Sequence, residues 1–493
     1  MIDAYAVDDV RAAEEAAMSA LPEGELMQRA AAGLAEVVAV RVARDGHVVV
    51  VVGGGNNGGD ALYAAARLAE RGFAVGAVTV SGHPHARGLA AALAAGVEVV
   101  ESTGESATPE GARLLAAADV VVDGVLGIGG RPGLPPAARA VFDLVPDEAW
   151  LVAVDLPSGA DPSGQDSSAD RVFADETVTF GVAKPVHLLP ATESAVGRLT
   201  VVDIGLEVDT VPAVQRLTHD DAARMWPVPG PGDDKYSRGV LGVVAGGEHY
   251  TGAALLSVTS AVCAGVGMVR YVGPSTPTAL VRAQVPEAVM GPGRVQAWVV
   301  GPGLDAEDDS EAGRAQVAAA REALASGEPC VVDAGALDLL DGPRAAPTLL
   351  TPHAGELARA LSRLTGRELT RAQVAGTPVT HARELADRTG CTVLLKGSTT
   401  LVVPAGSSRL PIRSQADAPA WLATAGSGDV LAGLAGTLLA AGLSPLDAGS
   451  LAALVHGLAG HAANPGGPVR ALAVAHGIPG VVAGLLERPP GRA

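Results

Sequence analysis

Four segments in the first half of the chain place carboxylate, amide and ammonium groups directly after short hydrophobic runs. They are GGGNNGGDA (53–61), VVDGVLGIGG (121–130), LVAVDLPSG (151–159) and TVTFGVAKP (177–185), and their reactive side chains are Asn56, Asn57, Asp60, Asp123, Asp155, Ser158 and Lys184. The carboxyl ends of parallel strands meet at one crevice, so we expect these side chains to line a single site. Each aspartate taken alone could instead be a helix cap or a loop residue.

The glycine-rich segment 53–61 could hold a phosphate. Glycine lets backbone N–H groups approach an anion, and the start of a following helix adds positive partial charge. Gly53, Gly55 and Gly58 also satisfy the dinucleotide-binding pattern GxGxxG. That pattern expects an acidic residue about 20 positions later, but the next strand ends at Ser81-Gly82. The match to a dinucleotide-binding loop is therefore weak.

A second group of motifs lies in the other half of the chain. ATAGSGDVLA (423–432) opens a long uncharged helical run, so the backbone amides of Gly426, Ser427 and Gly428 could form an anion hole. Asp429 could then act as a base near a transferring phosphoryl group, or it could simply be a helix-start acid. The segments LLKGSTT (394–400), TPHAGE (351–356), GPGL (301–304) and YTGA (250–253) could complete a nucleotide site.

Alternating strand-like and helix-like segments must position these groups. In the first half we expect strands at 47–52, 73–80, 97–100, 120–122 and 151–154, with helices at 61–71 and 87–95. In the second half we expect strands at 239–245, 297–300, 329–333, 348–351 and 392–395, and helices at 250–269 and 430–443. This order predicts an α/β protein with a doubly wound parallel sheet in the first half.

The rhythm breaks near residues 205–235, where an acidic segment is followed by the linker PVPGPGDDK (227–235). We therefore expect two unrelated domains, residues 1–215 and 216–493, as the length of 493 residues also suggests.

Composition limits the classes of partner. The formal charge of -19 argues against a nucleic acid and against an anionic membrane surface, which both require a basic face. The N-terminus lacks the layout of a signal peptide, and three scattered cysteines indicate free thiols in a reducing compartment. We expect a cytoplasmic enzyme that forms a homo-oligomer.

The motifs of the first half resemble the NAD(P)H-hydrate epimerase family over about residues 1–215. The resemblance implies a Rossmann-like sheet, a potassium ion near Asn57, Asp123 and Ser158, and catalysis by Asp155 and Lys184. It implies substrate contacts at Asn56, Asn57, Gly58, Gly59, Asp60, Gly127, Ile128, Gly129, Gly130, Arg131, Pro132, Gly133 and Asp155. Asp155 suits proton transfer, and Lys184 could neutralise a phosphate or a developing charge. Ala61 stands where the family usually has Gly, and Gly124 and Ile128 stand where Ala and Thr are usual.

The motifs of the second half resemble the ADP-dependent NAD(P)H-hydrate dehydratase family, which has a ribokinase-like fold. The resemblance implies nucleotide contacts at Lys396, Gly397, Ser398, Thr399, Thr400, Gly426, Ser427 and Gly428, and substrate contacts at Ala253, Gly303, His353 and Asp429. ADP, with Mg2+, would phosphorylate the hydroxyl of the hydrate before phosphate is expelled. Asp305 departs from the glycine that is usual after GPGL.

Together the two resemblances imply one enzyme that repairs hydrated NADH and NADPH (NADHX and NADPHX), epimerising the R and S hydrates and dehydrating the S hydrate. Two alternatives stay open at this point. The second half could be a small-molecule kinase, because a GSGD anion hole also serves such enzymes. The first half could be a non-catalytic Rossmann-like binding module.

Overall fold

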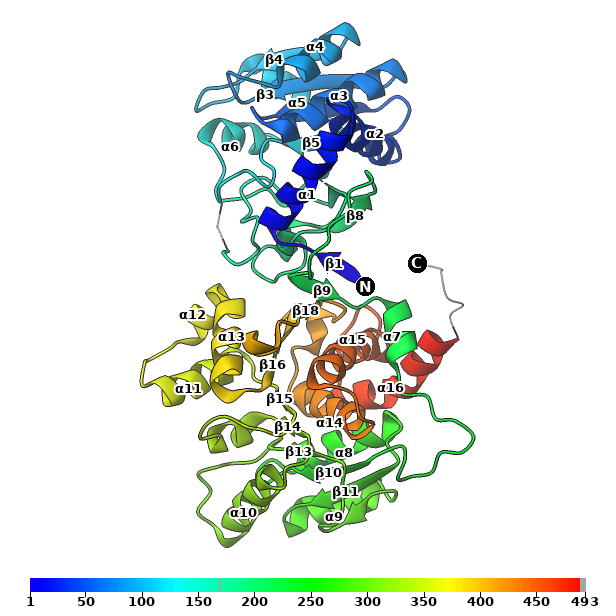
Figure 1. Ribbon diagram of the computed structural model, residues 1–493, viewed down its shortest axis with the longest axis vertical. Helices are drawn as coiled ribbons and strands as arrows, with labels where there is room; N and C mark the ends of the chain where they lie inside the picture. Colours follow the sequence, from blue (N-terminus) through cyan, green and yellow to red (C-terminus); the bar gives the residue numbers. More distant parts are fainter. Residues whose placement is uncertain (168–169, 488–493) are drawn as a thin grey trace. The chain divides into compact units, whose positions relative to one another are not determined.

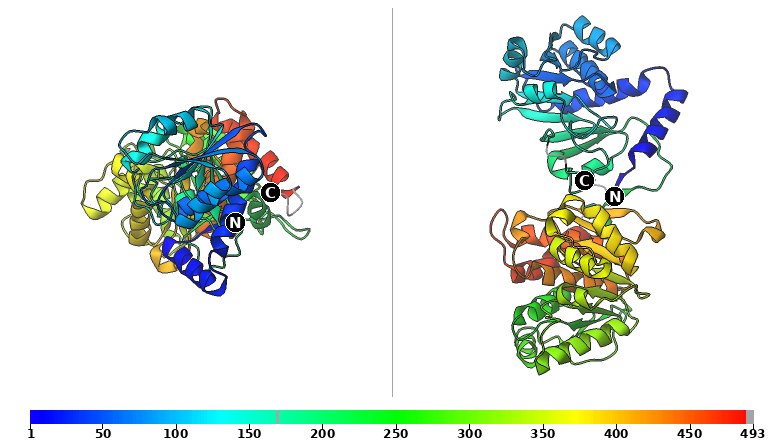
Figure 2. Two further views of the ribbon diagram at one scale, coloured as in Figure 1. Left: turned by 90° about the horizontal axis from the view of Figure 1, so that it is seen from above. Right: turned by 90° about the vertical axis from the view of Figure 1, so that its left-hand side faces the viewer.

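The computed structural model describes residues 1–167 and 170–487 and divides the chain into two units. One unit comprises Asp3–Val214, and the other comprises Gln215–Ala493 together with Met1–Ile2. Each unit is described separately (Figures 1 and 2). Among the described residues, no helix combines the length and the apolar character needed to cross a membrane.

The first unit is built on a seven-stranded sheet in the order β4-β3-β2-β5-β6-β7-β8, and every neighbouring pair is parallel. The strands are β2 (His47–Val52), β3 (Ala74–Thr79), β4 (Glu98–Glu101), β5 (Val120–Gly124), β6 (Trp150–Val154), β7 (Glu176–Phe180) and β8 (Arg198–Val202). The run HVVVVV forms β2 because a parallel strand is buried on both faces. The strand order reverses between β2 and β5, where open α/β sheets bind ligands.

Helices cover both faces of this sheet. They are α1 (Val7–Ala20), α2 (Glu25–Ala39), α3 (Asn56–Glu70), α4 (Ala86–Ala94), α5 (Pro109–Ala116) and α6 (Pro136–Phe142), with the 3-10 turns η1 (Pro185–His187) and η2 (Glu193–Ala195). The helices α2, α3 and α4 pack on the face that carries Val48, Val50 and Val52. The helices α5 and α6 pack on the face that carries Val49 and Val51.

The sheet of the second unit runs in the order β18-β17-β16-β15-β14-β13-β10-β11-β12. Its strands are β10 (Val240–Val244), β11 (Met268–Val272), β12 (Val289–Met290), β13 (Ala297–Val300), β14 (Cys330–Val332), β15 (Thr348–Leu350), β16 (Thr392–Leu395), β17 (Thr400–Val403) and β18 (Ile412–Gln415). The pairs β16–β17 and β17–β18 are antiparallel, whereas β10 to β16 pair in parallel. The short strands β1 (Ile2–Ala4) and β9 (Val214–Arg216) span the residues at which the two units join.

The helices of this unit also lie on both faces. They are α7 (His219–Met225), α8 (Thr251–Cys263), α9 (Ser275–Gln284), α10 (Glu311–Ala325), α11 (Ala354–Thr365), α12 (Arg371–Gly376), α13 (Pro378–Thr389), α14 (Ser427–Ala440), α15 (Pro445–Ala463) and α16 (Ala471–Leu486), with the 3-10 turns η3 (Ala334–Leu339), η4 (Gly406–Ser408) and η5 (Ala420–Leu422). A large core joins α8, α14, α15 and α16 to one face. Trp298 of β13 points to the other face, against α10.

The predicted α/β class is confirmed: a doubly wound parallel sheet is followed by a second α/β domain with a largely parallel sheet. Two boundaries differ from the prediction. The first is in segment 53–61, which is not all loop, because α3 begins at Asn56 and includes Gly58 and Gly59 in its first turn. The second is in 250–269, where α8 ends at Cys263 and the chain turns into β11.

Candidate active sites

A cavity of about 500 Å³ lies at the point where the strand order of the first sheet reverses. It is lined by Arg11, Glu14, Met18, Leu26, Met27, Ala30, Gly54, Gly55, Asn56, Asn57, Asp60, Val125, Leu126, Gly127, Ile128, Gly129, Gly130, Asp155, Phe180 and Ile204. All four predicted segments therefore meet in one place. The fourth contributes Phe180 directly and Lys184 through Asp155.

The carboxylate of Asp155 is held by a buried ammonium group. Its Oδ1 accepts hydrogen bonds from Lys184 Nζ at 2.6 Å and from Thr179 Oγ1 at 3.0 Å. Burial would raise the pKa of Asp155, but Lys184 reverses this effect and the pKa is lowered. The other oxygen, Oδ2, lies beside Gly127. The site therefore presents an ionised carboxylate with one oxygen free of the ammonium.

Lys184 cannot reach a phosphate in this arrangement. It is only 1% exposed, and its Nζ also donates to Thr179 Oγ1 at 2.7 Å and to the carbonyl of Phe180 at 3.2 Å. An ammonium group has three donors, and all three are occupied. In this arrangement the charge of Lys184 is directed at Asp155 and not at a phosphate.

His187 fixes the backbone of this pair. Its Nδ1 accepts from the backbone N–H of Lys184 at 3.0 Å, so its Nε2 donates to the carbonyl of Asp155 at 2.7 Å. Burial, followed by the nearby Lys184, lowers the pKa of His187 to about 4. The imidazole is thus neutral, and it couples the two residues through the main chain as well.

Asp123 and Ser158 form a second polar cluster beside the cavity, and Asn57 is linked to it through the backbone of Leu126. Ser158 donates to Asp123 from Oγ at 2.6 Å and from its backbone N–H at 2.8 Å. Asn57 Nδ2 donates to the carbonyls of Leu126 and Val154, at 3.1 and 3.0 Å, which leaves its Oδ1 as an acceptor near Gly127. Burial raises the pKa of Asp123 to about 6 despite these hydrogen bonds.

Asp60 is a second carboxyl group of the cavity and differs from Asp155. It is 9% exposed, and its Oδ1 is buried with no hydrogen-bond partner among the described residues. Burial, together with the charges of Asp155 and Glu14, raises the pKa of Asp60 well above its usual value. The pKa values of the two carboxyl groups therefore shift in opposite directions, which is the pattern expected of an acid and a base that work together.

Some predicted residues do not line this cavity. Gly58 and Gly59 lie inside the first turn of α3, where a Cβ on Gly58 would be 2.3 Å from the carbonyl of Gly53. Arg131, Pro132 and Gly133 are also absent from the lining. Ile128 lines it, but its side chain packs against an apolar cluster and its carbonyl accepts from Arg11 Nη2 at 2.9 Å.

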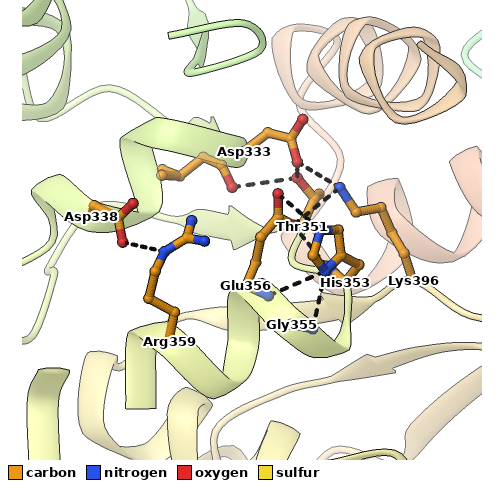
Figure 3. A network of polar contacts seen from close by, with 9 residues as sticks. Asp333, Asp338, Thr351, His353, Gly355, Glu356, Arg359 and Lys396 are labelled. Carbon is orange, nitrogen blue, oxygen red and sulfur yellow. Dashed lines mark hydrogen bonds and ion pairs between the residues drawn. The ribbon is translucent and has the colours of Figure 1, made fainter. Parts of the chain in front are cut away.

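The second site is organised around Lys396 (Figure 3). Its Nζ donates to Asp333 Oδ1 at 2.8 Å and lies 3.6 Å from Glu356 Oε2. Asp333 Oδ1 also accepts from Thr351 Oγ1 at 2.9 Å. Lys396 lies after β16, Asp333 after β14 and Thr351 after β15, so three adjacent parallel strands deliver this network at their carboxyl ends.

The N-terminal turn of α14 lies beside Lys396. Gly426 has a φ of 88° and precedes the helix, and a Cβ on Gly428 would lie 3.3 Å from Lys396 Nζ. Burial, followed by the charge of Asp333, raises the pKa of Asp429 to about 7. Ser257 of α8 donates to the carbonyl of Asp429 at 3.1 Å, which anchors this turn.

Beside α14 lies a cavity of about 1140 Å³. Its lining includes Ala253, Gly303, Glu356, Gly426 and Asp429, so most of the predicted substrate residues meet there. A Cβ on Gly303 would be 2.7 Å from Ala253 Cβ, which explains the glycine at a φ of 65°.

The remaining predicted residues lie around this cavity. His353 is outside the lining and caps α11, because its Nδ1 accepts from the backbone N–H groups of Gly355 and Glu356. Gly397 and Ser398 are exposed in the turn between β16 and β17, and Thr399 is buried. Asp305 is exposed and lines the cavity, where its Oδ1 accepts from the N–H of Glu307 at 3.0 Å.

Comparison with known proteins gives two family matches. Residues 241–473 match the model described as NAD(P)H-hydrate dehydratase, and residues 23–186 match the YjeF-related protein N-terminus. The bifunctional NAD(P)H-hydrate repair enzyme Nnr of Mycobacterium tuberculosis is 44% identical over 463 residues, which cover 89% of each chain. The enzyme of the same name from Mycobacterium leprae is 43% identical and covers 94% of each chain. This chain belongs to the family of bifunctional NAD(P)H-hydrate repair enzymes.

A crystal structure of the ADP/ATP-dependent NAD(P)H-hydrate dehydratase from Bacillus subtilis is also similar, with 23% identity and a TM-score of 0.48. It covers 55% of this chain and 99% of that one. Each family match falls within one unit of this chain: residues 23–186 lie in Asp3–Val214, and residues 241–473 lie in Gln215–Ala493.

The structure places residues in both sites that the sequence motifs did not identify. Glu14 and Arg11 reach the first cavity from α1, and no local pattern marks them because α1 precedes the sheet in sequence. Asp333 could have been found, since it ends a predicted strand as Asp123 and Asp155 do. Arg321 and Arg359 carry no motif at all.

Proposed function

We propose that this chain repairs hydrated NADH and NADPH, with the first unit epimerising the R and S hydrates and the second dehydrating the S hydrate with ADP. The observation that carries the proposal is that the four motifs of the first half line one cavity and four of the five motifs of the second half line another, each within its own unit. The products would be NAD(P)H, AMP and phosphate.

Epimerisation at a carbon that bears a hydroxyl group next to a ring nitrogen requires the carbon–oxygen bond to break and re-form. One group donates a proton to the hydroxyl so that it leaves as water with help from the ring nitrogen, and another accepts a proton when water adds to the opposite face. Asp155, kept ionised by Lys184, is suited to accept it through Oδ2. Asp60, whose raised pKa favours the protonated form, is suited to donate it. Lys184 thus acts through Asp155 and not on the substrate.

We propose that a potassium ion binds beside Asn57, Asp123 and Ser158. Among residues 1–167 and 170–487, no group of three or more His, Cys, Asp and Glu side chains could hold a metal ion. The cluster instead offers amide, hydroxyl and carboxylate oxygens, which suit a hard cation. When bound, the ion would supply positive charge beside Asp123, whose carboxylate is otherwise buried without a cation. Replacing potassium with a bulky organic cation should slow epimerisation and leave dehydration unchanged.

Dehydration in the second unit would begin with transfer of the terminal phosphoryl group of ADP, with Mg2+, to the hydroxyl of the hydrate. Asp429 would take the proton of that hydroxyl, and the amides of Gly426, Ser427 and Gly428 would hold the migrating phosphate. Lys396 lies against Gly428, so its charge would assist the same step. The carbon–oxygen bond then breaks, phosphate leaves, and the neighbouring carbon loses a proton to restore the double bond.

The test is to follow the absorbance of reduced nicotinamide with a mixture of R and S NADHX, ADP and potassium. We expect an ADP-dependent rise that consumes both epimers. A rise that stops when the S epimer is exhausted would leave the first unit as a binding module. No rise with ADP or ATP would instead support a small-molecule kinase, to be screened with alcohol acceptors.

A further inference from the structure

The cavity beside α14 has arginines on only one part of its wall. They are Arg321 of α10 and Arg359 and Arg363 of α11. Arg359 and Arg363 are four residues apart and so share a face of α11. The part of the wall formed by α8 and α14 carries Ala253, Gly426 and Asp429 and has no lysine or arginine among the described residues.

The three guanidinium groups differ in how many of their N–H donors already form hydrogen bonds within the protein. Arg363 Nη2 donates to the carbonyls of Leu337 and Leu340, at 3.0 and 2.6 Å, so it fastens η3 to α11. Arg359 uses its Nε for Asp338, at 3.1 Å, and its two terminal nitrogens contact none of the residues drawn in Figure 3. Arg321 is exposed and makes no hydrogen bond or ion pair with any described residue. Arg321 and Arg359 therefore keep donors for a ligand.

The acidic residues around these arginines make the arginines important for binding an anionic ligand. Asp305, Glu307, Asp338, Glu356 and Asp429 line the same cavity, and the chain carries a net charge of -19. A phosphate in this field is repelled unless cations neutralise it. A guanidinium presents parallel N–H donors that match two phosphate oxygens.

From this arrangement, and resting on the proposed function, we propose that Arg321 and Arg359 bind the diphosphate of the hydrated dinucleotide. The hydrated ring then lies toward Asp429, and the phosphates lie toward α10 and α11. Arg363 is a positioning residue that holds η3, which carries Asp338. ADP is the other source of phosphate. Of its predicted contacts, Gly426 lines this cavity, whereas Lys396 and Gly428 do not.

The experiment measures KM and kcat of dehydration for Arg321→Ala and Arg359→Ala with S-NADHX and ADP varied in turn. Arg314→Ala is the matched control, because Arg314 is an exposed arginine of α10 that does not line the cavity. Loss of a charge-assisted contact made equally in substrate and transition state raises KM and spares kcat. We expect KM for NADHX to rise about 10- to 100-fold, with kcat, KM for ADP and epimerisation unchanged.

A second substrate separates phosphate binding from a general distortion of the cavity. The hydrate of reduced nicotinamide riboside has no phosphate, so the two variants should use it as well as the unchanged chain does. An equal penalty with this substrate, an unchanged KM for NADHX, or a raised KM for ADP would each overturn the assignment while leaving the repair function standing. If the unchanged chain does not dehydrate NADHX at all, the proposed function fails, and the arginine assignment fails with it.

Discussion

At the scale of single residues, Asp155 combines a reactive charge with a strained backbone. Its φ is 66°, in the left-handed region that asparagine tolerates and alanine does not. Asp155→Asn therefore removes the charge and keeps the conformation. It should reduce epimerisation about 10²- to 10⁴-fold, the usual contribution of a general base. The measurement is consumption of the R hydrate, with dehydration of the S hydrate by the same sample as the control.

Asp155→Ala tests the backbone separately, because it also forces alanine into the left-handed region at a cost of about 1–2 kcal/mol. It should unfold at lower temperature than the asparagine variant. If Asp155→Asn retains epimerisation well above the spontaneous rate, the carboxylate is not the base.

The pH dependence of dehydration should report Asp429. Only the ionised carboxylate can accept a proton, and burial raises its pKa to about 7. We expect kcat/KM to rise with pH below about 7 and to level off above it. Asp333→Asn should move this rise in kcat/KM to lower pH for two reasons. It removes the charge of Asp333, which raises the pKa of Asp429. It also weakens the hold of residue 333 on Lys396, whose charge lowers the pKa of Asp429. A rise that stays in place would mean that another group controls the profile.

The sequence predicted those residues of the sites that directly follow a strand or begin a helix. Asp123, Asp155, Lys396 and Asp429 lie within short motifs whose place on an α/β sheet is general, so their convergence could be anticipated. Glu14 and Arg321 could not be found this way, since each reaches its cavity from a helix face that local sequence does not orient.

At the scale of elements, the packing of α3 on β5 explains two departures from the family pattern together. A Cβ on Gly124 of β5 would lie 2.5 Å from Ala61 Cβ of α3. There is room for one methyl group between the two elements, and this chain carries it on α3 where the family usually carries it on β5. Ala61 and Gly124 are therefore a compensating pair.

A double-mutant cycle tests this compensation. Gly124→Ala alone should destabilise the first unit by about 1–3 kcal/mol through overpacking. Adding Ala61→Gly should recover part of this loss, because the space is then free, although glycine in a helix costs about 0.5–1 kcal/mol. The measurement is the urea midpoint from the fluorescence of Trp150, with S-hydrate dehydration as a control for the second unit. Strictly additive effects would contradict the coupling.

Strands were easier to predict than helix starts and antiparallel strands. The β-branched runs at 47–52, 297–300 and 392–395 match β2, β13 and β16, because buried parallel strands need continuous hydrophobic residues. The glycines of segment 53–61 suggested a loop, but α3 already begins at Asn56. Gly58 is a glycine because this first turn packs closely against Gly53 and leaves no space for a side chain. Strands β17 and β18 were missed, since their pairing depends on the rest of the sheet.

At the scale of the whole molecule, the two sites share no residue, because each cavity is lined entirely from its own unit. One unit would therefore release an epimer that the other binds from solution. The two activities should then be separable onto different molecules. This expectation follows from the separate linings and requires no particular arrangement of the units.

Mixing two single-site variants tests this separation. Asp155→Asn alone should dehydrate the S hydrate and leave the R hydrate, and Asp429→Asn alone should equilibrate the epimers without forming NADH. An equimolar mixture should convert both epimers completely, because the S hydrate made by one chain diffuses to the other. The chain with both substitutions, mixed with Asp155→Asn, is the control and should add nothing. If the first mixture leaves the R hydrate unconsumed, the epimer does not pass through solution and the two sites must work within one molecule.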